Sequence, residues 1–400
     1  MRPAAQAWAD ARAILAVRLD GIGDLLMTTP ALRALKEGGD ERTLTLLTSP
    51  ASAEAARELP FVDEVIVAVA PWMKSAETSQ VSRADVAALT ARLRHRAFDA
   101  GIVFTVCTQS ALPAAMLLFE AGIPRRAAYC RENPYALLTD WRPDPDRDMR
   151  AGVRHEVARH IDLVRSLGFA VTETRLQFPV RTGARARMHA KARAAGMRRR
   201  RPWLVVHPGA TAPSRRYPES QLIEALAALG RDGHWQIAVA GAAEDASTAR
   251  AIATAVPGIV SLAGLLELGE LAALLQAADV VVCNNSAPAH LAAAVGTPVV
   301  DLYALTNPQH TPWGVRHRVL SHDVDCRYCL KSICPHGHMR CLAGVAPAQV
   351  VSAVRSLAAE TNACDLAGRP SARAHERAGP PQARIRPAAR SAAGSGASTR

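Results

Sequence analysis

Residues 14–36 read ILAVRLDGIGDLLMTTPALRALK, an apolar run followed by a glycine-containing turn and a helical pattern. The apolar run at 14–17 predicts a buried strand, and the spacing of apolar residues after Gly23 predicts a helix. Gly21 and Gly23 would let the backbone turn sharply and approach a ligand closely. This segment therefore predicts one strand–turn–helix unit of a parallel sheet.

The alternation of strand and helix continues through both halves of the 400-residue chain. It predicts, in each half, a parallel sheet covered by helices on both faces. Further strands are predicted at 44–47, 65–69, 101–104, 203–207, 236–240, 259–262, 280–283 and 298–302. Further helices are predicted at 51–59, 84–96, 219–231, 246–255, 268–277 and 290–295. The predicted fold class is α/β, with two Rossmann-like doubly wound domains facing a central cleft, and ligands are expected where strands end in turns.

Composition suggests how the chain divides. We expect an N-terminal domain over 12–181, an Arg- and Ala-rich linker over 182–201 and a C-terminal domain over 202–345. A helix at 346–362 and a basic tail at 363–400 are expected to follow. Residues 364–400 hold seven Arg against two acidic residues and almost no aliphatic side chains, so we expect the tail to be disordered.

The composition also argues against several classes of protein. Hydrophobic residues make up 49% of the chain, which suits a globular core, yet no uninterrupted apolar run is long enough for a transmembrane helix. The start of the sequence has no clean signal-peptide cleavage site, and eight cysteines are too few for a disulfide scaffold. We therefore expect a cytoplasmic protein. The net charge is +12, but no nucleic-acid-binding motif accompanies it, so we expect no nucleic-acid partner. The expected partners are anionic substrates or the anionic inner face of a membrane.

Two of the predicted turns carry side chains suited to chemistry. Asp24 begins a helix, where a carboxylate can either cap the helix or accept a proton from an incoming hydroxyl. The turn at 207–218 combines Gly209, the hydroxyls of Thr211 and Ser214 and the guanidinium of Arg215. Such groups suit a diphosphate, although paired arginines in a loop are also common as plain surface charge.

Two further features lie in the C-terminal half. The turn at 280–290 leads into a helix with Pro near its start, where free N–H groups and the helix dipole can hold an anion. His290 would either donate to a phosphate oxygen or form a structural hydrogen bond. Cys326, Cys329, Cys334 and Cys341 surround two histidines, His336 and His338, but their spacing matches no common zinc or ferredoxin pattern, so we expect no metal there.

In their order and spacing, these segments resemble glycosyltransferase family 9, the ADP-heptose:lipopolysaccharide heptosyltransferases. The similarity covers residues 12–360 and rests on the opening segment, the HPGAT…RRYP loop, NNSAPAHLAAAVGTPVV and CRYCLKSICPHGHMRC. It implies a GT-B fold, with the acceptor on the N-terminal side and the nucleotide sugar on the C-terminal side. In such a fold the helix at 346–362 is expected to cross back to the N-terminal domain. The chemistry it implies is metal-independent and uses no cofactor.

The resemblance also assigns roles to individual residues. Gly23-Asp24 matches the family's Gly-Asp turn, which supplies the general base, and Arg215 falls where the family usually has a Lys that contacts the donor phosphates. Asp245, or its neighbour Glu244, lies where an acidic residue contacts the nucleotide ribose. The turn that cradles the diphosphate matches Ser286, Ala287 and His290.

The same turn departs from the family. Asn285, Ala287 and Ala289 stand where family sequences commonly have Asp, Gly and Met. Without a carboxylate at 285, one acceptor for sugar hydroxyls is missing. We therefore expect Asn285 to lie on the donor side of the site and the sugar specificity of the protein to be altered.

The function implied is inverting transfer of heptose or a related sugar from a nucleoside-diphosphate sugar, with ADP-heptose as the expected donor. The expected acceptor is a lipopolysaccharide core or a related glycan or glycolipid. Two alternatives stay open from the residues. One is a sugar transferase of secondary metabolism with a small soluble acceptor, and the other is a non-catalytic nucleotide-binding protein that uses the cysteine loop as a redox or metal module.

Overall fold

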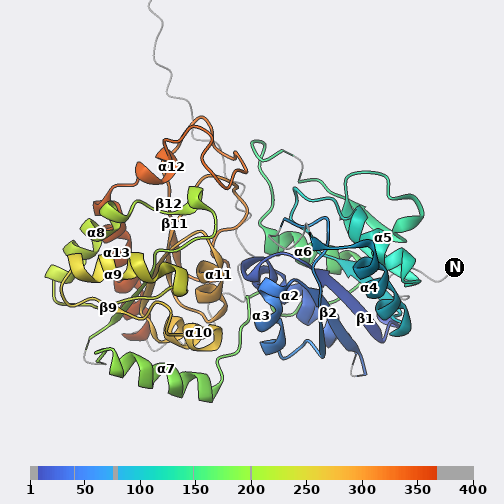
Figure 1. The fold of residues 1–400 in the computed structure, drawn as a ribbon, viewed down its shortest axis with the longest axis horizontal. Helices are drawn as coiled ribbons and strands as arrows, with labels where there is room; N and C mark the ends of the chain where they lie inside the picture. The colour runs from blue at the N-terminus through green and yellow to red at the C-terminus, as the bar shows by residue number, and fades with distance from the viewer. Residues whose placement is uncertain (1–7, 40, 75–79, 147, 199–200, 367–400) are drawn as a thin grey trace, which may run out of the picture.

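The computed structural model describes residues 8–366 except 40, 75–79, 147 and 199–200. Two α/β halves lie side by side, each built on one six-stranded sheet (Figure 1). The paired strands of both sheets run parallel. The predicted fold class, two doubly wound α/β units, is confirmed.

The N-terminal sheet has the order β3-β2-β1-β4-β5-β6. Its strands are β1 (Ala13–Arg18), β2 (Thr43–Thr48), β3 (Glu64–Val67), β4 (Ala100–Val103), β5 (Arg125–Cys130) and β6 (Asp140–Pro143). Its helices are α2 (Ile22–Glu37), α3 (Ala53–Glu58), α4 (Arg83–His95), α5 (Leu112–Glu120) and α6 (Glu156–Ser166). Because side chains alternate along a strand, Ile14 and Ala16 of β1 pack with α2 and α6, whereas Leu15 and Val17 pack with α4 and α5.

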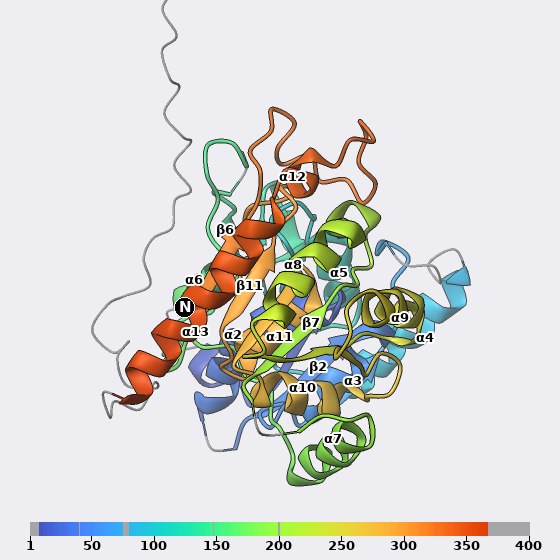
Figure 2. The ribbon, with the colours of Figure 1, turned by 90° about the vertical axis from the view of Figure 1, so that its left-hand side faces the viewer.

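The C-terminal sheet has the order β12-β11-β10-β7-β8-β9, which repeats the topology of the first. Its strands are β7 (Trp203–His207), β8 (Gln236–Val239), β9 (Val260–Ser261), β10 (Val280–Asn284), β11 (Val299–Leu302) and β12 (His317–Leu320). Its helices are α7 (Thr182–Ala194), α8 (Glu219–Arg231), α9 (Ala246–Ala255), α10 (Leu268–Ala277), α11 (Ala287–Ala294), α12 (Arg340–Ala343) and α13 (Pro347–Leu366). Helices α10 and α11 cover one face, and α8, α9 and α13 cover the other (Figure 2).

The two halves share one apolar core. Buried side chains of α2 and β1 belong to the same cluster as those of α10, α11 and β10. The junction lies where α2 and α11 pack together, and both helices begin there with their N-terminal turns. The architecture therefore brings one strand-ending turn from each sheet to a common boundary.

Several elements differ from the sequence prediction. Strands β5, β6 and β12 and helices α5 and α6 were not expected, because charged or small residues interrupt their apolar patterns. The predicted linker contains α7, which packs on α10 through Arg187 and Lys191, both bonded to the buried Glu270 carboxylate at 2.8 and 2.6 Å.

The last helix also departs from expectation. Helix α13 ends at Leu366, beyond the predicted end at 362. An apolar stripe containing Val350, Val354 and Leu357 packs it along the C-terminal sheet, where a crossover onto the N-terminal half was expected. The basic tail, from residue 367 onward, lies outside the described residues. Among the helices that are described, none has the length and apolar character needed to cross a bilayer.

Candidate active site

The site lies at the point in each sheet where the chain order reverses. In the N-terminal sheet, β1 and β4 are neighbours, but β1 leads to α2 on one face and β4 leads to α5 on the other. In the C-terminal sheet, β7 and β10 are neighbours and lead to α8 and α11 on opposite faces. Diverging connections leave a crevice at the carboxyl ends of such strands, and ligands of doubly wound sheets bind there.

Asp24 lies in the first turn of α2 and is about one quarter exposed. Its Oδ1 atom lies 3.2 Å from Nη2 of Arg18, the last residue of β1, and the Arg18 Nε lies 3.3 Å from Oδ2 of Asp20. The Arg18 side chain is fully buried. Burial raises the pKa of Asp20, and the nearby Arg18 charge opposes that rise. One buried guanidinium therefore holds two carboxylates at the end of β1.

The two halves meet at Gly23. A Cβ atom on Gly23 would lie 2.8 Å from Cδ2 of His290, in the first turns of α11, so only glycine permits this approach without displacing the imidazole. Gly21 has a φ of −79°, and a Cβ there would meet nothing within 4 Å. The space at Gly21 would therefore admit a side chain, whereas Gly23 permits the close approach of the two halves.

His290 is buried, and its Nδ1 atom has no hydrogen-bond partner among the described residues. Burial, together with the neighbouring His310 and His155, lowers its pKa well below the ordinary range. The ring is therefore neutral near pH 7, with one unpaired nitrogen at the start of α11. Ser286 is the N-cap of this helix and Ala287 is its first residue.

The loop after β7 is packed around Asp245. A Cβ on Gly209 would collide with the Asp245 carboxylate, so glycine lets the two segments pack this closely. Asp245 ends a short 3-10 turn (Ala243–Asp245) and accepts a hydrogen bond from the Ala242 N–H at 3.1 Å. The neighbouring Glu244 is exposed and Thr211 is exposed as well. Of the two acidic residues, Asp245 is the one that packs against the loop after β7.

Ser214 and Arg215 lie in the same loop but differ in their surroundings. The Ser214 hydroxyl donates to the Lys331 carbonyl at 2.8 Å, so it anchors the cysteine-rich loop and would have to break that bond to reach a phosphate. The Arg215 Nε is buried and has no hydrogen-bond partner among the described residues. Of the two, Arg215 is the group with an unused donor.

A carboxylate that the sequence analysis passed over lies nearby. Asp301 is fully buried in β11 beside Cys283, and neither of its oxygens has a hydrogen-bond partner among the described residues. Burial raises the pKa of Asp301 far above the ordinary range, and the Arg215 charge counteracts part of that rise. An acidic residue inside the apolar run PVVDL was the signal that could have identified it.

The Asn285 side chain has a structural reason to be an amide. Its Oδ1 accepts from the Ala304 N–H at 3.2 Å, and its Nδ2 donates to the Ala304 carbonyl at 3.4 Å. A carboxylate could not make the second bond. Asn285 is 3% exposed, and its contact with a donor sugar stays a prediction.

Buried ion pairs join α6 to the loop after β11. The fully buried Glu156 carboxylate lies 3.0 Å from His160, 3.1 Å from Arg159 and 3.9 Å from His310 of the C-terminal half. The Glu156 N–H also donates to the Gln309 carbonyl at 3.1 Å. We call this set the α6 seam. Sequence reasoning missed it because its charges interrupt the helical apolar pattern of α6.

The cysteine-rich loop contacts both halves. The Ser332 carbonyl accepts from the Ser214 N–H at 3.0 Å, and its hydroxyl accepts from Lys74 of the N-terminal half at 3.2 Å. Arg150 donates to the Asp325 carbonyl at 3.2 Å. Cys326, Cys329, Cys334 and Cys341 are unpaired thiols, and within the described chain no three metal-binding side chains converge on one point.

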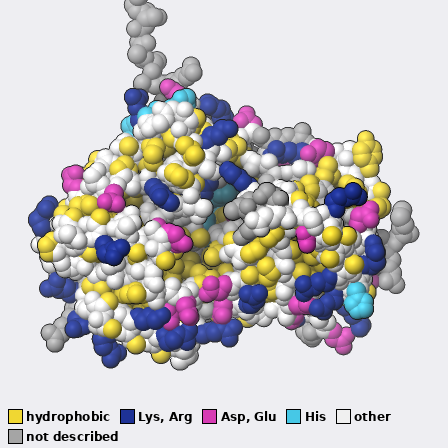
Figure 3. All heavy atoms as spheres, viewed as in Figure 1, with side chains coloured by type: hydrophobic (Ala, Val, Ile, Leu, Met, Phe, Trp, Pro, Cys, Tyr) yellow, Lys and Arg dark blue, Asp and Glu magenta, His cyan; other side chains and the backbone are white. Residues whose placement is uncertain are grey.

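Charge on the surface is distributed widely. Lys and Arg side chains are scattered over both halves, interspersed with Asp and Glu, on the face seen in Figure 3. Close ion pairs occur on the surface, as between Lys36 and Asp63 at 2.8 Å, and also inside, where Arg18 meets Asp24 and Arg159 meets Glu156.

Comparison with known proteins gives consistent matches. The model of glycosyltransferase family 9 (heptosyltransferase) matches residues 86–340. The lipopolysaccharide heptosyltransferase 2 of Salmonella typhimurium is 24% identical over 361 residues, which cover 87% of this chain and 99% of that protein.

Solved structures match over a similar length. A glycosyl transferase family 9 protein from Veillonella parvula superposes with a TM-score of 0.72 at 20% identity, covering 87% of this chain and 98% of that one. The E. coli ADP-heptose lps heptosyltransferase II gives a TM-score of 0.67 at 23% identity, covering 88% and 99%. These structures share the two-domain fold described above.

Proposed function

The chain belongs to glycosyltransferase family 9, and from that premise we propose that it transfers heptose from ADP-heptose to a lipopolysaccharide-type acceptor with inversion at the anomeric carbon. The curated relative is named for lipopolysaccharide and the E. coli structure for ADP-heptose. The observation that carries the proposal is the close approach of Asp24's helix turn to the start of α11 across the junction of the two halves.

Asp24 is the proposed general base. It lies at a helix N-terminus, is partly exposed and is oriented by the Arg18 guanidinium at 3.2 Å. Its carboxylate would accept the proton of an acceptor hydroxyl as that oxygen forms a bond to the anomeric carbon. The bond between this carbon and the diphosphate breaks in the same displacement, so the configuration inverts and the nucleoside diphosphate leaves with its electron pair.

The C-terminal half would hold the leaving diphosphate. The Arg215 Nε is an unused buried donor, and the start of α11 at Ala287 presents the positive end of the helix dipole. The unpaired Nδ1 of His290 adds a further neutral hydrogen-bonding group. Donors that are fixed before the reaction stabilise developing charge at little reorganisation cost.

The nucleoside would lie over β7 and β8. Gly209, after β7, and Gly241, after β8, leave space that the Asp245 side chain occupies, so a ribose hydroxyl bound over these two strands could donate to its carboxylate. A cytoplasmic protein at the inner face of a membrane is the setting we propose, because the acceptor class is assembled on lipid.

The test is release of ADP from ADP-heptose in the presence of a lipopolysaccharide inner-core acceptor. We expect Asp24→Asn to reduce turnover by about 10²–10⁴-fold, with ADP affinity unchanged because the nucleotide binds the other half. The control is Glu37→Gln, at the far end of the same helix, which should leave turnover near that of the wild type. Retention of more than about a tenth of wild-type turnover by Asp24→Asn would exclude it as the base.

A further inference from the structure

The cysteine-rich loop, residues 326–341, carries exposed apolar side chains that the proposed reaction does not use. Ile333 is 72% exposed and Leu330 is 50% exposed, although both belong to residue types that proteins usually bury. Lys331 and Ser332, which lie between them, are exposed as well. We call residues 330–333 the loop tip, because all four consecutive side chains reach solvent and the first and last are apolar.

The backbone of the loop tip is anchored to the C-terminal half. The Leu330 N–H donates to the Thr306 carbonyl at 2.9 Å, and Ser214 donates to the carbonyls of Lys331 and Ser332 at 2.8 and 3.0 Å. Leu330 also has a φ of +56°, in the left-handed region that is unfavourable for a leucine. The apolar side chains are therefore exposed on an anchored backbone, and their exposure does not come from a loop without contacts.

The charge of the loop is of one sign. Residues 326–341 contain Arg327, Lys331 and Arg340, together with two histidines and no Asp or Glu. Arg327 pairs with Asp323, just outside the loop, at 3.0 Å. Lys331 and Arg340 are exposed. The loop therefore presents cations beside its apolar side chains.

Basic side chains of the N-terminal half extend this cationic surface. Lys74 donates to the Ser332 hydroxyl and Arg150 donates to the Asp325 carbonyl, each at 3.2 Å, and both basic residues are exposed. The exposed carboxylates of Asp323 and Asp325 lie at its edge. The loop itself lies beside α12, at the top of the boundary between the two halves (Figure 1). The surface therefore spans both halves of the molecule.

Apolar side chains surrounded by cations suit the interface of an anionic bilayer. The apolar groups can enter the headgroup layer, while neighbouring Lys and Arg side chains attract anionic lipid. A soluble polyanion would use the cations and gain nothing from Leu330 and Ile333. An apolar protein surface would use these two residues and gain nothing from the cations. A bilayer with anionic headgroups uses both.

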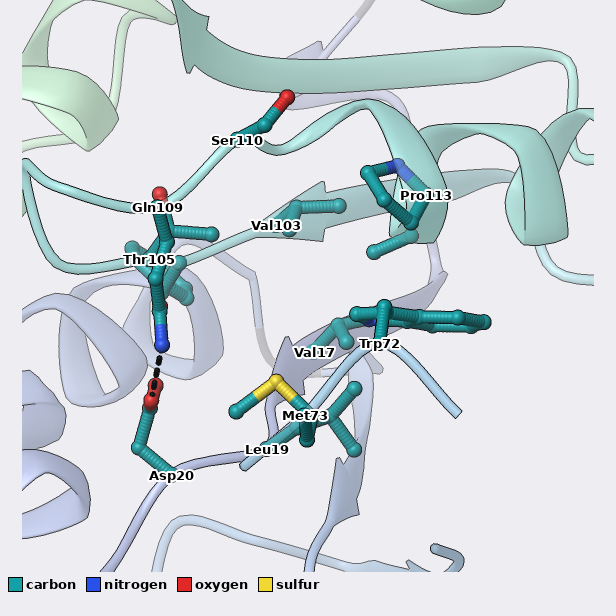
Figure 4. A pocket seen from close by; sticks show the side chains of 12 residues that line it. Val17, Leu19, Asp20, Trp72, Met73, Val103, Thr105, Gln109, Ser110 and Pro113 are labelled. Carbon is teal, nitrogen blue, oxygen red and sulfur yellow. Dashed lines mark hydrogen bonds between the residues drawn. The ribbon is translucent and has the colours of Figure 1, made fainter. Parts of the chain in front are cut away.

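The surface also adjoins the acceptor side of the proposed site. Lys74 directly follows Trp72 and Met73, which line a cavity of about 220 Å³ at the ends of β1 and β4 (Figure 4). Asp20 lines the same cavity and shares a guanidinium with the proposed base, Asp24. A lipid-linked acceptor held in a bilayer at the loop tip would therefore present its glycan to this end of the N-terminal sheet.

We propose that the loop tip and the exposed cations around it, Lys74, Arg150, Lys331 and Arg340, dock the protein on the surface of an anionic bilayer. The inference rests on the proposed function for the presence of a lipid-linked acceptor, but docking can be measured without donor or acceptor. Docking orients the boundary between the halves toward the lipid that carries the acceptor.

Co-sedimentation of the full chain with vesicles measures docking. The probes are vesicles of phosphatidylcholine alone and vesicles that also contain about 30% phosphatidylglycerol, at about 0.1 M and about 0.5 M salt. We expect the full chain to partition at least about tenfold more strongly onto the anionic vesicles at the lower salt concentration. Residues 367–400 are present in every sample, so their basic charge contributes equally to all variants.

Two variants test the apolar part of the surface. Ile333→Ser and Leu330→Asn should each weaken partitioning onto anionic vesicles at least about threefold, at both salt concentrations, because salt does not screen the loss of apolar burial. Asn tolerates a left-handed φ, so Leu330→Asn keeps the loop backbone. The matched control is Leu265→Ser. Leu265 is 51% exposed and follows β9, at the edge of the sheet opposite β12, and its variant should bind like the wild type.

A double variant tests the charged part. Lys331→Gln with Arg340→Gln should weaken partitioning about tenfold at the lower salt concentration and much less at the higher one, because salt screens this attraction. The matched control removes two exposed cations of α7, Arg185→Gln with Arg193→Gln, and should change partitioning little.

Two results would overturn the inference. One is equal partitioning onto neutral and anionic vesicles. The other is full affinity for anionic vesicles in both Ile333→Ser and Leu330→Asn, which would assign binding to charge alone. Transfer to a short water-soluble acceptor reports separately on the proposed function. Docking without any transfer would refute that function alone, and transfer without docking would refute this inference alone.

Discussion

At the scale of single residues, charged side chains are buried among the apolar residues of strands and helices. Arg18 ends β1, Asp301 lies within β11 and Glu156 begins α6, and all three side chains are fully buried. Arg18 and Glu156 have oppositely charged neighbours, which offset the cost of removing a charge from water. Asp301 has no hydrogen-bond partner in the described structure, so its burial is not offset in this way.

Asp301→Asn should stabilise the protein at neutral and alkaline pH. Burial raises the pKa of Asp301 in the folded state, so the unfolded state loses this proton first, above an ordinary pKa of about 3.9. Wild-type stability should therefore fall as pH rises from that value through the raised folded pKa, and the Asn variant escapes this loss. We expect a gain of roughly 1–3 kcal/mol in the free energy of unfolding at pH 8, shrinking toward pH 4.

Urea denaturation at pH 4 and pH 8 measures this effect. The control is Asp325→Asn, an exposed position, which should change stability little at either pH. A loss of stability for Asp301→Asn at pH 8 would show that the carboxylate has a partner that compensates its burial.

At the scale of elements, two helix starts approach each other through a glycine. Helix α2 contributes Gly23 and α11 contributes His290, and the contact leaves no space for a side chain. Neighbouring Gly21 has open space around it, so the same loop contains one glycine that the packing requires and one that it does not.

Gly23→Ala should lower the rate of transfer by about 10–100-fold, since small displacements of reacting groups are costly. Helix propensity favours alanine over glycine, so a loss of activity would not come from a weaker α2. Gly21→Ala is the matched control and should stay close to the wild type. Initial rates of ADP release compare the two variants, and equal rates would show that the His290 ring moves aside without consequence.

The sequence was informative about elements with strong local patterns. The central strands β1, β7 and β10 and the turns after them were predictable because apolar runs end in glycine or in a helix-starting proline. Edge strands such as β6 and β12, and helix α6, were not, because their patterns mix charged with apolar residues and depend on partners distant in the chain. The Ser214 and Asn285 contacts were also hidden, since their partners Lys331 and Ala304 are remote in sequence.

At the scale of the whole molecule, the α6 seam is a buried polar contact between the halves. Glu156 interacts with its own helix through Arg159 and His160 and with the C-terminal half through His310. Although burial alone would raise it, the pKa of Glu156 lies well below the usual range because the neighbouring His160 and His310 rings and the Arg159 charge favour the carboxylate.

Glu156→Gln should destabilise the protein by about 3–5 kcal/mol, the usual cost of breaking a buried ion pair from one side. A depressed carboxyl pKa stabilises the fold above the unfolded pKa of about 4.3, and this contribution is lost as pH falls through the folded value. The difference from the wild type should therefore persist down to about pH 4 and shrink below it.

Calorimetric unfolding across this pH range measures the difference. The matched control is Glu54→Gln, an exposed position in the first turn of α3, which should behave like the wild type. A Glu156→Gln variant as stable as the wild type at pH 7 would show that the seam contributes nothing to holding the halves together.

The cysteine-rich loop and the α6 seam hold the two halves with unequal strength. The loop reaches the N-terminal half through exposed hydrogen bonds from Lys74 and Arg150, which cost little to break, whereas the seam is buried and charged. If the halves swing apart to admit substrates, the motion should pivot about the seam. The loop would then travel outward with the C-terminal half, pulling the Ser214–Arg215 turn with it through the Lys331 carbonyl.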